Sequence, residues 1–443
     1  MITNAPRRVV VTGMGVVSPL GNTLQTVWEA LRTGRCGIGP IQSMPTEHLP
    51  IQCGGESRDF RGHIDDFGPL ADDRKKQIRK GLKVMCRDIQ MGVAAAQLAL
   101  TNAQLDVTTI DPDRMGVVFG ADHVMTTPEE FTEAIRQCFD APHHFDLARW
   151  PTHGIAKVTP LWLLKYLPNM PASHIAIYND LRGPSNSLTY REASGNLAVG
   201  EAYCAIVRGS ADRMVTGATG CYLHPLKTLQ IALQSELATR RAEGNLPCRP
   251  FDRERTGMVL GEGAGALVLE ELEMARARGA TILAEVLGQG SSVALQPNSV
   301  TNSSQAIANA MRMAMRGTAI RASEVGHIHA HGLGTHQADR DEAHAIHQLF
   351  GAEPGAHVPP VTAAKSFFGN LGAGTGAVEL VCTILALQHQ QLFPILGYQT
   401  PDPTCPIRAA TGGDTPAGNN ALNISFTMQG QASCVLVRRW NEG

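Results

Sequence analysis

The chain has 443 residues, of which 43% are hydrophobic, 18% charged and 5% aromatic. This length suits two α/β lobes or one large duplicated unit, and 45 glycines with few aromatics favour packed layers of helices and strands over disorder. Because 38 basic side chains nearly balance 40 acidic ones, the overall charge gives no attraction to nucleic acid or to an anionic membrane.

The sequence predicts a cytoplasmic protein without a membrane span. Its ten cysteines form no C-x-x-C pair, which favours reduced, buried thiols. The first apolar run follows Arg7 and Arg8 and meets glycine and proline by residue 19, so it is too short for the core of a signal peptide. No stretch approaches the ~20 apolar residues that cross a bilayer.

Predicted strands and helices alternate along the chain. A strand begins at Arg8 and leads through a Gly/Pro turn into a helix at 23–33. Further strands are predicted at 114–120, 213–217, 258–270, 282–287, 326–330, 361–364, 421–427 and 433–438, and further helices at 194–207, 304–315, 340–349 and 373–388. We expect the long insertion at 121–160 to cover a pocket. The alternation predicts two similar halves, 1–255 and 256–443.

A basic helix is predicted from Asp72 onward, before the apolar run that starts at Met91. It carries Arg79 and Lys80, and Lys83 follows shortly after. Such a run is typical of a solvated helix face, and it equally suits a docking patch for an acidic partner. The pattern alone leaves both interpretations open.

Neither a metal site nor a nucleotide cofactor is indicated. His327, His329 and His331 alternate along a predicted strand, but the sequence has no H-E-x-x-H and no carboxylate at ligand spacing. The glycine strings that start at Gly261 and Gly372 match neither G-x-G-x-x-G in a βαβ unit nor a phosphate-binding G-x-x-x-x-G-K. We therefore expect these glycines to allow close packing, and no cofactor.

Five segments resemble the β-ketoacyl-ACP synthase family, and they occur in the family's order. They are VVVTGMGVVSPLG at the start, VTPLWLLKYLPNMPASHIAIYNDLRGPSNS from Val158, PFDRERTGMVLGEGAGALVLEELEMARARGA from Pro250, HAHGLGT from His329, and AAKSFFGNLGAGTGAVEL from Ala363. The resemblance implies the thiolase fold, in which two similar α/β halves stack as a five-layered αβαβα sandwich. It also implies an acyl carrier protein (ACP) as partner, and a dimer with active sites near the subunit interface.

In that family a cysteine at a helix N-terminus takes the acyl group from ACP, and two histidines and a lysine then help malonyl-ACP lose CO₂ and attack. The cysteine is expected nine residues beyond Gly183, and that position is Glu192. An acyl-glutamate would be an anhydride, far more labile than a thioester, so transfer from ACP would run uphill. No cysteine lies between Asp140 and Tyr203 to replace it.

The resemblance also assigns the residues around this position. His331 matches the first catalytic histidine, Lys365 the lysine and Glu342 an acidic residue of the same loop, with Thr335 ending the histidine motif. The second histidine is Asn370, whose amide can donate a hydrogen bond but cannot carry a proton. Phe426 and Met428 lie in the segment that matches the family's glycine-rich gate, and the scarcity of glycine there implies a stiffer gate.

Two classes of function follow, and the first is favoured because His331, Lys365 and Glu342 are retained. One is an acyltransferase-class enzyme that acts on ACP-bound thioesters without an acyl-cysteine, by decarboxylation or by condensation with Glu192 or His331 as base. The other is a non-catalytic partner, similar to the chain length factor of type II polyketide systems. Glu192 could alternatively cap a helix or pair with Arg191. Arg79, Lys80 and Lys83 fall where the family presents positive charge to ACP, and both a homodimer and a heterodimer with a ketosynthase remain open.

Overall fold

A computed structural model describes residues 7–238, 246–297, 299–351, 355, 357–413 and 415–441. Its ten main strands form two sets of five that join where β1 (Val9–Val17) pairs with β10 (Ala284–Val293). From β1 outward, the first set continues with β9 (Glu262–Glu271), β8 (Arg213–Cys221), β4 (Met115–Gly120) and β7 (Ser185–Leu188). From β10 outward, the second set continues with β14 (Gln431–Arg439), β13 (Asn420–Phe426), β11 (His327–His329) and β12 (Val361–Thr362).

The two sets have the same pairing pattern. In each, the first two pairings from the junction are antiparallel and the next two are parallel. This repetition confirms the prediction of two similar α/β halves. The position of the domain boundary stays a prediction, and the hydrogen-bond ladders group β9, which lies beyond residue 255, with the first set.

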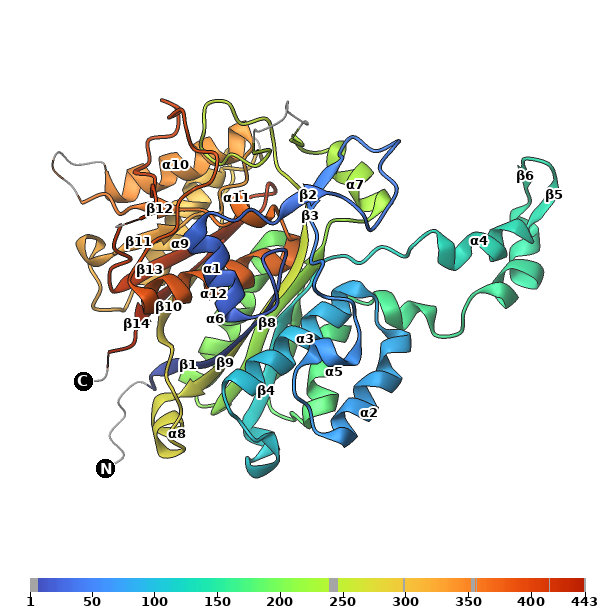
Figure 1. The fold of residues 1–443 in the computed structure, drawn as a ribbon, viewed down its shortest axis with the longest axis horizontal. Coiled ribbons are helices and arrows are strands. Elements are labelled where there is room, and N and C mark those ends of the chain that lie inside the picture. The colour runs from blue at the N-terminus through green and yellow to red at the C-terminus, as the bar shows by residue number, and fades with distance from the viewer. Residues whose placement is uncertain are drawn as a thin grey trace.

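Helices form three layers around the two sets of strands (Figure 1). α3 (Arg87–Asn102) and α5 (Met170–Asn179) cover the outer face of the first set, and α9 (Ser303–Met315) with α10 (His336–Phe350) covers that of the second. Between the sets lie α6 (Ser194–Val207) and α12 (Thr375–His389), which contact strands of both. Both central helices are buried and mostly apolar, as a helix between two sheets must be. The predicted five-layer α/β architecture is thus confirmed.

Smaller elements complete the body. They are α1 (Leu24–Thr33), β2 (Ile38–Pro40), β3 (Cys53–Gly55), α2 (Asp72–Gly81), α7 (Pro225–Ala232), α8 (Leu272–Ala277) and α11 (Lys365–Phe368). Close packing depends on glycine at Gly15 of β1, where an added Cβ would lie 2.0 Å from the carbonyl oxygen of Ala95 on α3. Within the described ranges, we find no helix with both the length and the apolar character to cross a membrane.

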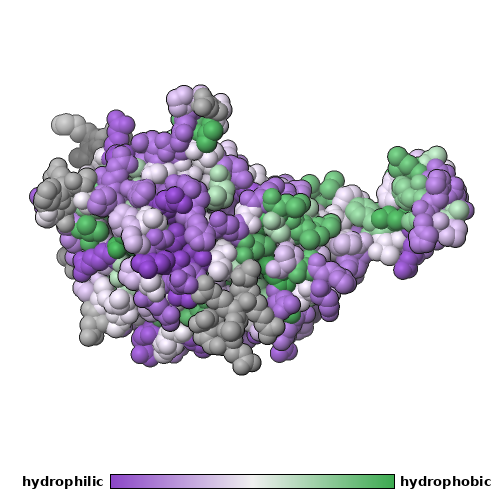
Figure 2. Space-filling view, turned by 90° about the horizontal axis from the view of Figure 1, so that it is seen from above, coloured by the Kyte–Doolittle hydropathy of each residue, from purple (hydrophilic) through white to green (hydrophobic). Residues whose placement is uncertain are grey.

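The insertion after β4 forms an arm that extends away from the body (Figure 1). Asp122 and His123, at the start of the insertion that was expected to cover a pocket, line a pocket beside the body. The arm contains α4 (Glu129–Arg136), β5 (Phe139–Ala141) and β6 (His144–Phe145). Its own small aromatic core holds it together: the ring centroids of Phe131 and Trp162 lie 4.9 Å apart. Apolar side chains such as Leu147 and Leu161 remain exposed, and Figure 2 shows apolar surface on both the arm and the adjoining body.

Candidate active site

Glu192 lies in the turn that opens α6. The preceding residue, Arg191, has φ 49°, in the left-handed region that costs a residue other than glycine roughly 1 kcal/mol or more. This conformation turns the chain sharply from the extended segment after β7 into α6. As a result the Glu192 side chain points inward and is only 7% exposed.

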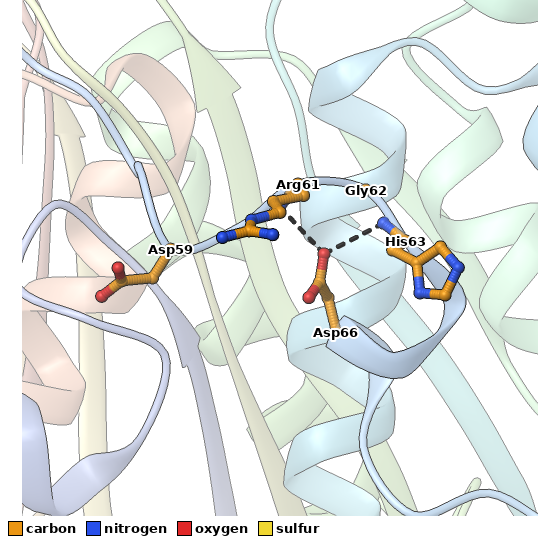
Figure 3. Close-up of a pocket in the computed structure, with 5 residues that line it drawn as sticks. All are labelled: Asp59, Arg61, Gly62, His63 and Asp66. Atoms are coloured by element: carbon orange, nitrogen blue, oxygen red, sulfur yellow. Dashed lines mark hydrogen bonds between the residues drawn. The ribbon is translucent and has the colours of Figure 1, made fainter.

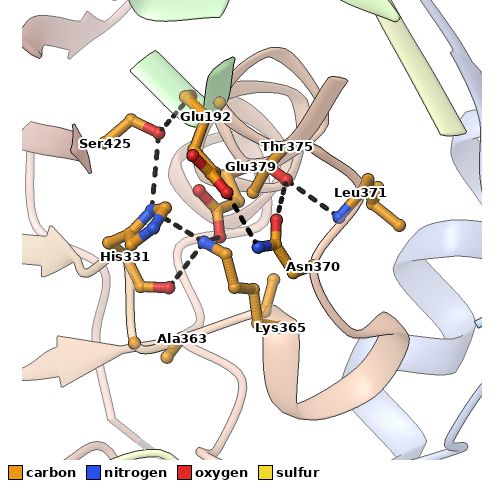
Figure 4. Close-up of polar contacts among 12 residues, drawn as sticks. Glu192, His331, Ala363, Lys365, Asn370, Leu371, Thr375, Glu379 and Ser425 are labelled. Atoms are coloured by element: carbon orange, nitrogen blue, oxygen red, sulfur yellow. Dashed lines mark hydrogen bonds and ion pairs between the residues drawn. The ribbon is translucent and has the colours of Figure 1, made fainter. Parts of the chain in front are cut away.

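One carboxylate oxygen of Glu192 accepts two hydrogen bonds, of which Figure 4 shows the one from Asn370. The Tyr222 hydroxyl donates to Oε1 over 2.9 Å, and Asn370 Nδ2 donates over 3.1 Å. The amide orientation of Asn370 is set by its own oxygen, which accepts from Gly372 N–H and from the Thr375 hydroxyl, each at 3.1 Å. Asn370 therefore holds Glu192 in place.

A second network centres on Lys365 (Figure 4). Its Nζ donates to His331 Nδ1 over 2.9 Å, to the His331 carbonyl over 2.6 Å and to Glu379 Oε1 over 2.8 Å. Burial and the Lys365 charge lower the pKa of His331 well below its ordinary value, so the imidazole is neutral. Because Nδ1 accepts from Lys365, the ring proton is assigned to Nε2, which can donate but cannot act as a base.

Ser425 on β13 links the two networks. Its Oγ donates to the Glu192 carbonyl over 2.8 Å and lies 3.5 Å from His331 Nδ1. Glu192 and His331 line one narrow pocket, with Tyr222, Phe426 and Met428 among the other residues of its wall. Its volume is about 30 Å³, on the scale of one or two water molecules. The site thus joins a turn of the first half to loops of the second.

The remaining predicted residues surround this inner pocket. Glu342 fixes the histidine loop by accepting the backbone N–H groups of His331 (2.6 Å) and Gly332 (2.8 Å), and burial raises the pKa of its carboxyl to about 8. Thr335 occupies the position before α10 without a capping hydrogen bond from its side chain, and it is absent from the described pocket lining. The Phe426 ring lies 4.6 Å from that of His331, and Met428 lies at the partly exposed mouth.

Several residues of the site carried no readable signal in the sequence. Tyr222 follows β8 as an ordinary aromatic residue, and nothing about its position pointed to a carboxylate partner. Glu379 lies within the helix that was predicted at 373–388 without any role at the site, yet it is the buried counter-ion of Lys365. Burial raises the pKa of Glu379 to about 7, against the effect of the Lys365 charge. The Nε atom of Arg191 lies 3.9 Å from Oε2 of Glu192, which is a long distance for an ion pair.

The three alternating histidines have different surroundings. His327 Nδ1 contacts the Ala417 carbonyl at 2.7 Å, and His329 Nδ1 contacts the Thr383 hydroxyl at 2.8 Å. Across the part of the chain that the structure describes, no group of three His, Cys, Asp or Glu side chains is arranged to hold a metal ion.

Two surface features lie outside the inner pocket. Arg79, Lys80 and Lys83 are exposed on α2 and the turn after it, and none of them forms an ion pair with another described residue. An open depression of about 640 Å³ lies at the loop from Asp59 to Asp66, where Asp66 accepts two backbone N–H groups (Figure 3). Its described lining shares no residue with the inner pocket.

The Lys365–Glu379 pair can be tested by a double-mutant cycle. Glu379→Gln leaves a buried ammonium without a counter-ion, so we expect it to lower the free energy of unfolding by about 3–5 kcal/mol. Lys365→Met should cost less, because Glu379 can take up a proton near neutral pH. In urea denaturation the double variant should lose about 1–3 kcal/mol less than the sum of the single variants. Additive losses would mean that the pair is not coupled.

Comparisons with known proteins agree with this geometry. The model for the Beta-ketoacyl synthase N-terminal domain matches residues 6–275, and that for the C-terminal domain matches 283–399. A 3-oxoacyl-[acyl-carrier-protein] synthase 2 of Staphylococcus aureus (strain COL) is 33% identical over 95% of this chain and 94% of its own length. Another, from Synechocystis, is 31% identical over 92% of this chain and 91% of its own length.

Solved structures show the same relation. A beta-ketoacyl synthase from Burkholderia phymatum STM815 superposes with a TM-score of 0.82 at 28% identity, covering 98% of this chain and 100% of its own. The ishigamide ketosynthase/chain length factor gives a TM-score of 0.80 at 26% identity, and the match covers 99% of this chain and 100% of the other. The protein described here belongs to the β-ketoacyl synthase family.

Proposed function

We propose that the protein removes CO₂ from a malonyl thioester carried by ACP and does so without an acyl-cysteine intermediate. The proposal rests on one observation above all: a carboxylate, Glu192, lines the same pocket as His331, while Lys365 and Glu379 support that histidine. The support from family membership is that the relatives named above are 3-oxoacyl-ACP synthases, whose name specifies an ACP-bound product.

The reaction needs no nucleophile on the protein. The bond between the malonyl α-carbon and its carboxylate breaks, CO₂ leaves, and the electron pair passes into an enolate of the acetyl thioester. His331 Nε2–H is the donor available to stabilise the enolate oxygen as its charge develops. Protonation of the enolate carbon by water then gives acetyl-ACP. Lys365 acts through His331, because its ammonium is used up in contacts with His331 and Glu379.

Decarboxylation suits this site better than condensation. With its proton on Nε2, His331 cannot act as the base for condensation. Glu192 is also unsuited to that role, because its Oε1 already accepts two hydrogen bonds. A Glu192 carboxylate beside the malonyl carboxylate also repels it, which favours moving that negative charge onto the enolate oxygen as neutral CO₂ leaves.

Turnover of malonyl-ACP by the purified protein tests the proposal. We expect acetyl-ACP to accumulate, detected by intact-mass spectrometry. His331→Ala should slow the reaction by about 10²–10³-fold, since it removes the donor to the enolate oxygen. Glu192→Gln keeps the size of the side chain and removes the repulsion, so a smaller loss is expected. Malonyl-ACP that remains intact in the presence of the native protein would reject the proposal.

A non-catalytic role similar to that of a chain length factor is the second candidate. The closed arrangement of Glu192, Tyr222 and Asn370 favours it, as does the exposed apolar arm, which suits a subunit interface. In this role the chain pairs with a ketosynthase that carries the cysteine; a homodimer is expected for the enzyme. A protein that is inert alone but co-purifies with such a ketosynthase would favour the partner role.

Both roles call for docking of ACP, and we assign it to the basic surface at Arg79, Lys80 and Lys83. These side chains are exposed and free of ion pairs with described residues, so a patch of acidic side chains can neutralise them at little cost.

Charge reversal tests this surface. Lys80→Glu with Lys83→Glu should weaken ACP binding about tenfold or more at low salt, measured by isothermal titration calorimetry, and the loss should shrink as salt rises. Arg316→Glu is the matched control, because Arg316 is also exposed and lies just after α9, on the outer face of the other half. Equal losses in both proteins would refute a specific patch.

A further inference from the structure

The inner pocket has a larger neighbour. This outer pocket, of about 430 Å³, is lined by the root of the arm at Asp122 and Pro168 and by Lys227 of α7. Two residues, Arg191 and Ile231, line both pockets. The two spaces are therefore separated by little more than the side chains that face both.

Tyr222 lies between Glu192 of the inner pocket and Lys227 of the outer one. Its ring lines the inner pocket, while the Lys227 ammonium, which lines the outer pocket, lies 4.9 Å from the ring centroid. One side of Tyr222 thus faces the inner pocket and another faces the wall of the outer one. The ring is 1% exposed, so it occupies space that neither solvent nor substrate can enter.

The ring is held at both ends. Its hydroxyl donates to Glu192, the residue in the cysteine position of the family. Its edge packs on Gly372, where φ is 61° and an added Cβ would lie 2.7 Å from ring atom Cε1. Lys227 in turn is fixed by Asp122 (3.2 Å) and by the His123 carbonyl (2.9 Å). Few rotations of Tyr222 are compatible with these contacts.

We infer that Tyr222 determines the size of the acyl group that this protein accepts, by closing the inner pocket against the outer one. With the ring in place, the site takes a short acyl unit such as acetyl and excludes longer acyl chains. The inference rests on the proposed function, since it treats the inner pocket as the acyl site. It goes beyond that function by naming the residue that limits chain length.

Binding of unreactive acyl-pantetheine amides tests the inference separately from turnover. The probes are the acetyl, butanoyl and hexanoyl amides, titrated calorimetrically into the native protein, Tyr222→Ala and Tyr222→Phe. The native protein should bind the hexanoyl probe at least about tenfold more weakly than the acetyl probe. In Tyr222→Ala this penalty should vanish, because each methylene that enters the opened space contributes up to about fourfold in affinity. Tyr222→Phe keeps the ring and should keep the penalty.

Three results would overturn the inference. They are equal binding of acetyl and hexanoyl probes by the native protein, a failure of Tyr222→Ala to bind the hexanoyl probe, and a loss of discrimination in Tyr222→Phe as complete as in Tyr222→Ala. The unfolding temperature verifies that each variant is folded, and Tyr222→Val provides a smaller truncation if the alanine protein is not. Acetyl-ACP production reports on the proposed function alone, so the two can fail independently.

Discussion

The site depends on a carboxylate that is buried and held by hydrogen bonds at the start of a central helix. Glu192 Oε1 accepts from Tyr222 and Asn370, and its backbone carbonyl accepts from Ser425. Burying a charge costs free energy unless donors compensate it. The donors to the carboxylate come from the residue after β8 and the loop after α11, and the donor to the carbonyl comes from β13, so contacts from both halves of the fold meet at Glu192.

The fold explains why such a carboxylate can be accommodated without a change of architecture. Among the described strands, the two sets pair with each other through β1 and β10, and α6 and α12 fill the space between them. Loops from both halves converge at the start of α6, which places His331 and Lys365 near residue 192. The Glu192 carboxylate therefore lies at the junction of the two halves, within a framework whose strand pairing is the same in both.

Much of this organisation is predictable from the sequence, because strand-helix alternation and the matching motifs extend over nearly the whole chain. The helix predicted at 194–207 is α6 itself, and the counting from Gly183 identified the buried carboxylate. The orientation of the insertion was not predictable, since its direction depends on aromatic packing between distant residues such as Phe131 and Trp162. Tyr222 and Glu379 were missed for the same reason: their partners lie far away in the sequence.

The central claim is that residue 192 occupies the place where the acyl group is captured in enzymes of this family. Glu192→Cys with acetyl-ACP, followed by peptide mapping in a mass spectrometer, tests it most directly. We predict one acetyl group on residue 192 and none on the ten native cysteines, which are half-buried or buried. If Cys at position 192 stays unmodified while the variant is folded, or if a native cysteine is acetylated instead, the assignment of this pocket as the acyl site is wrong.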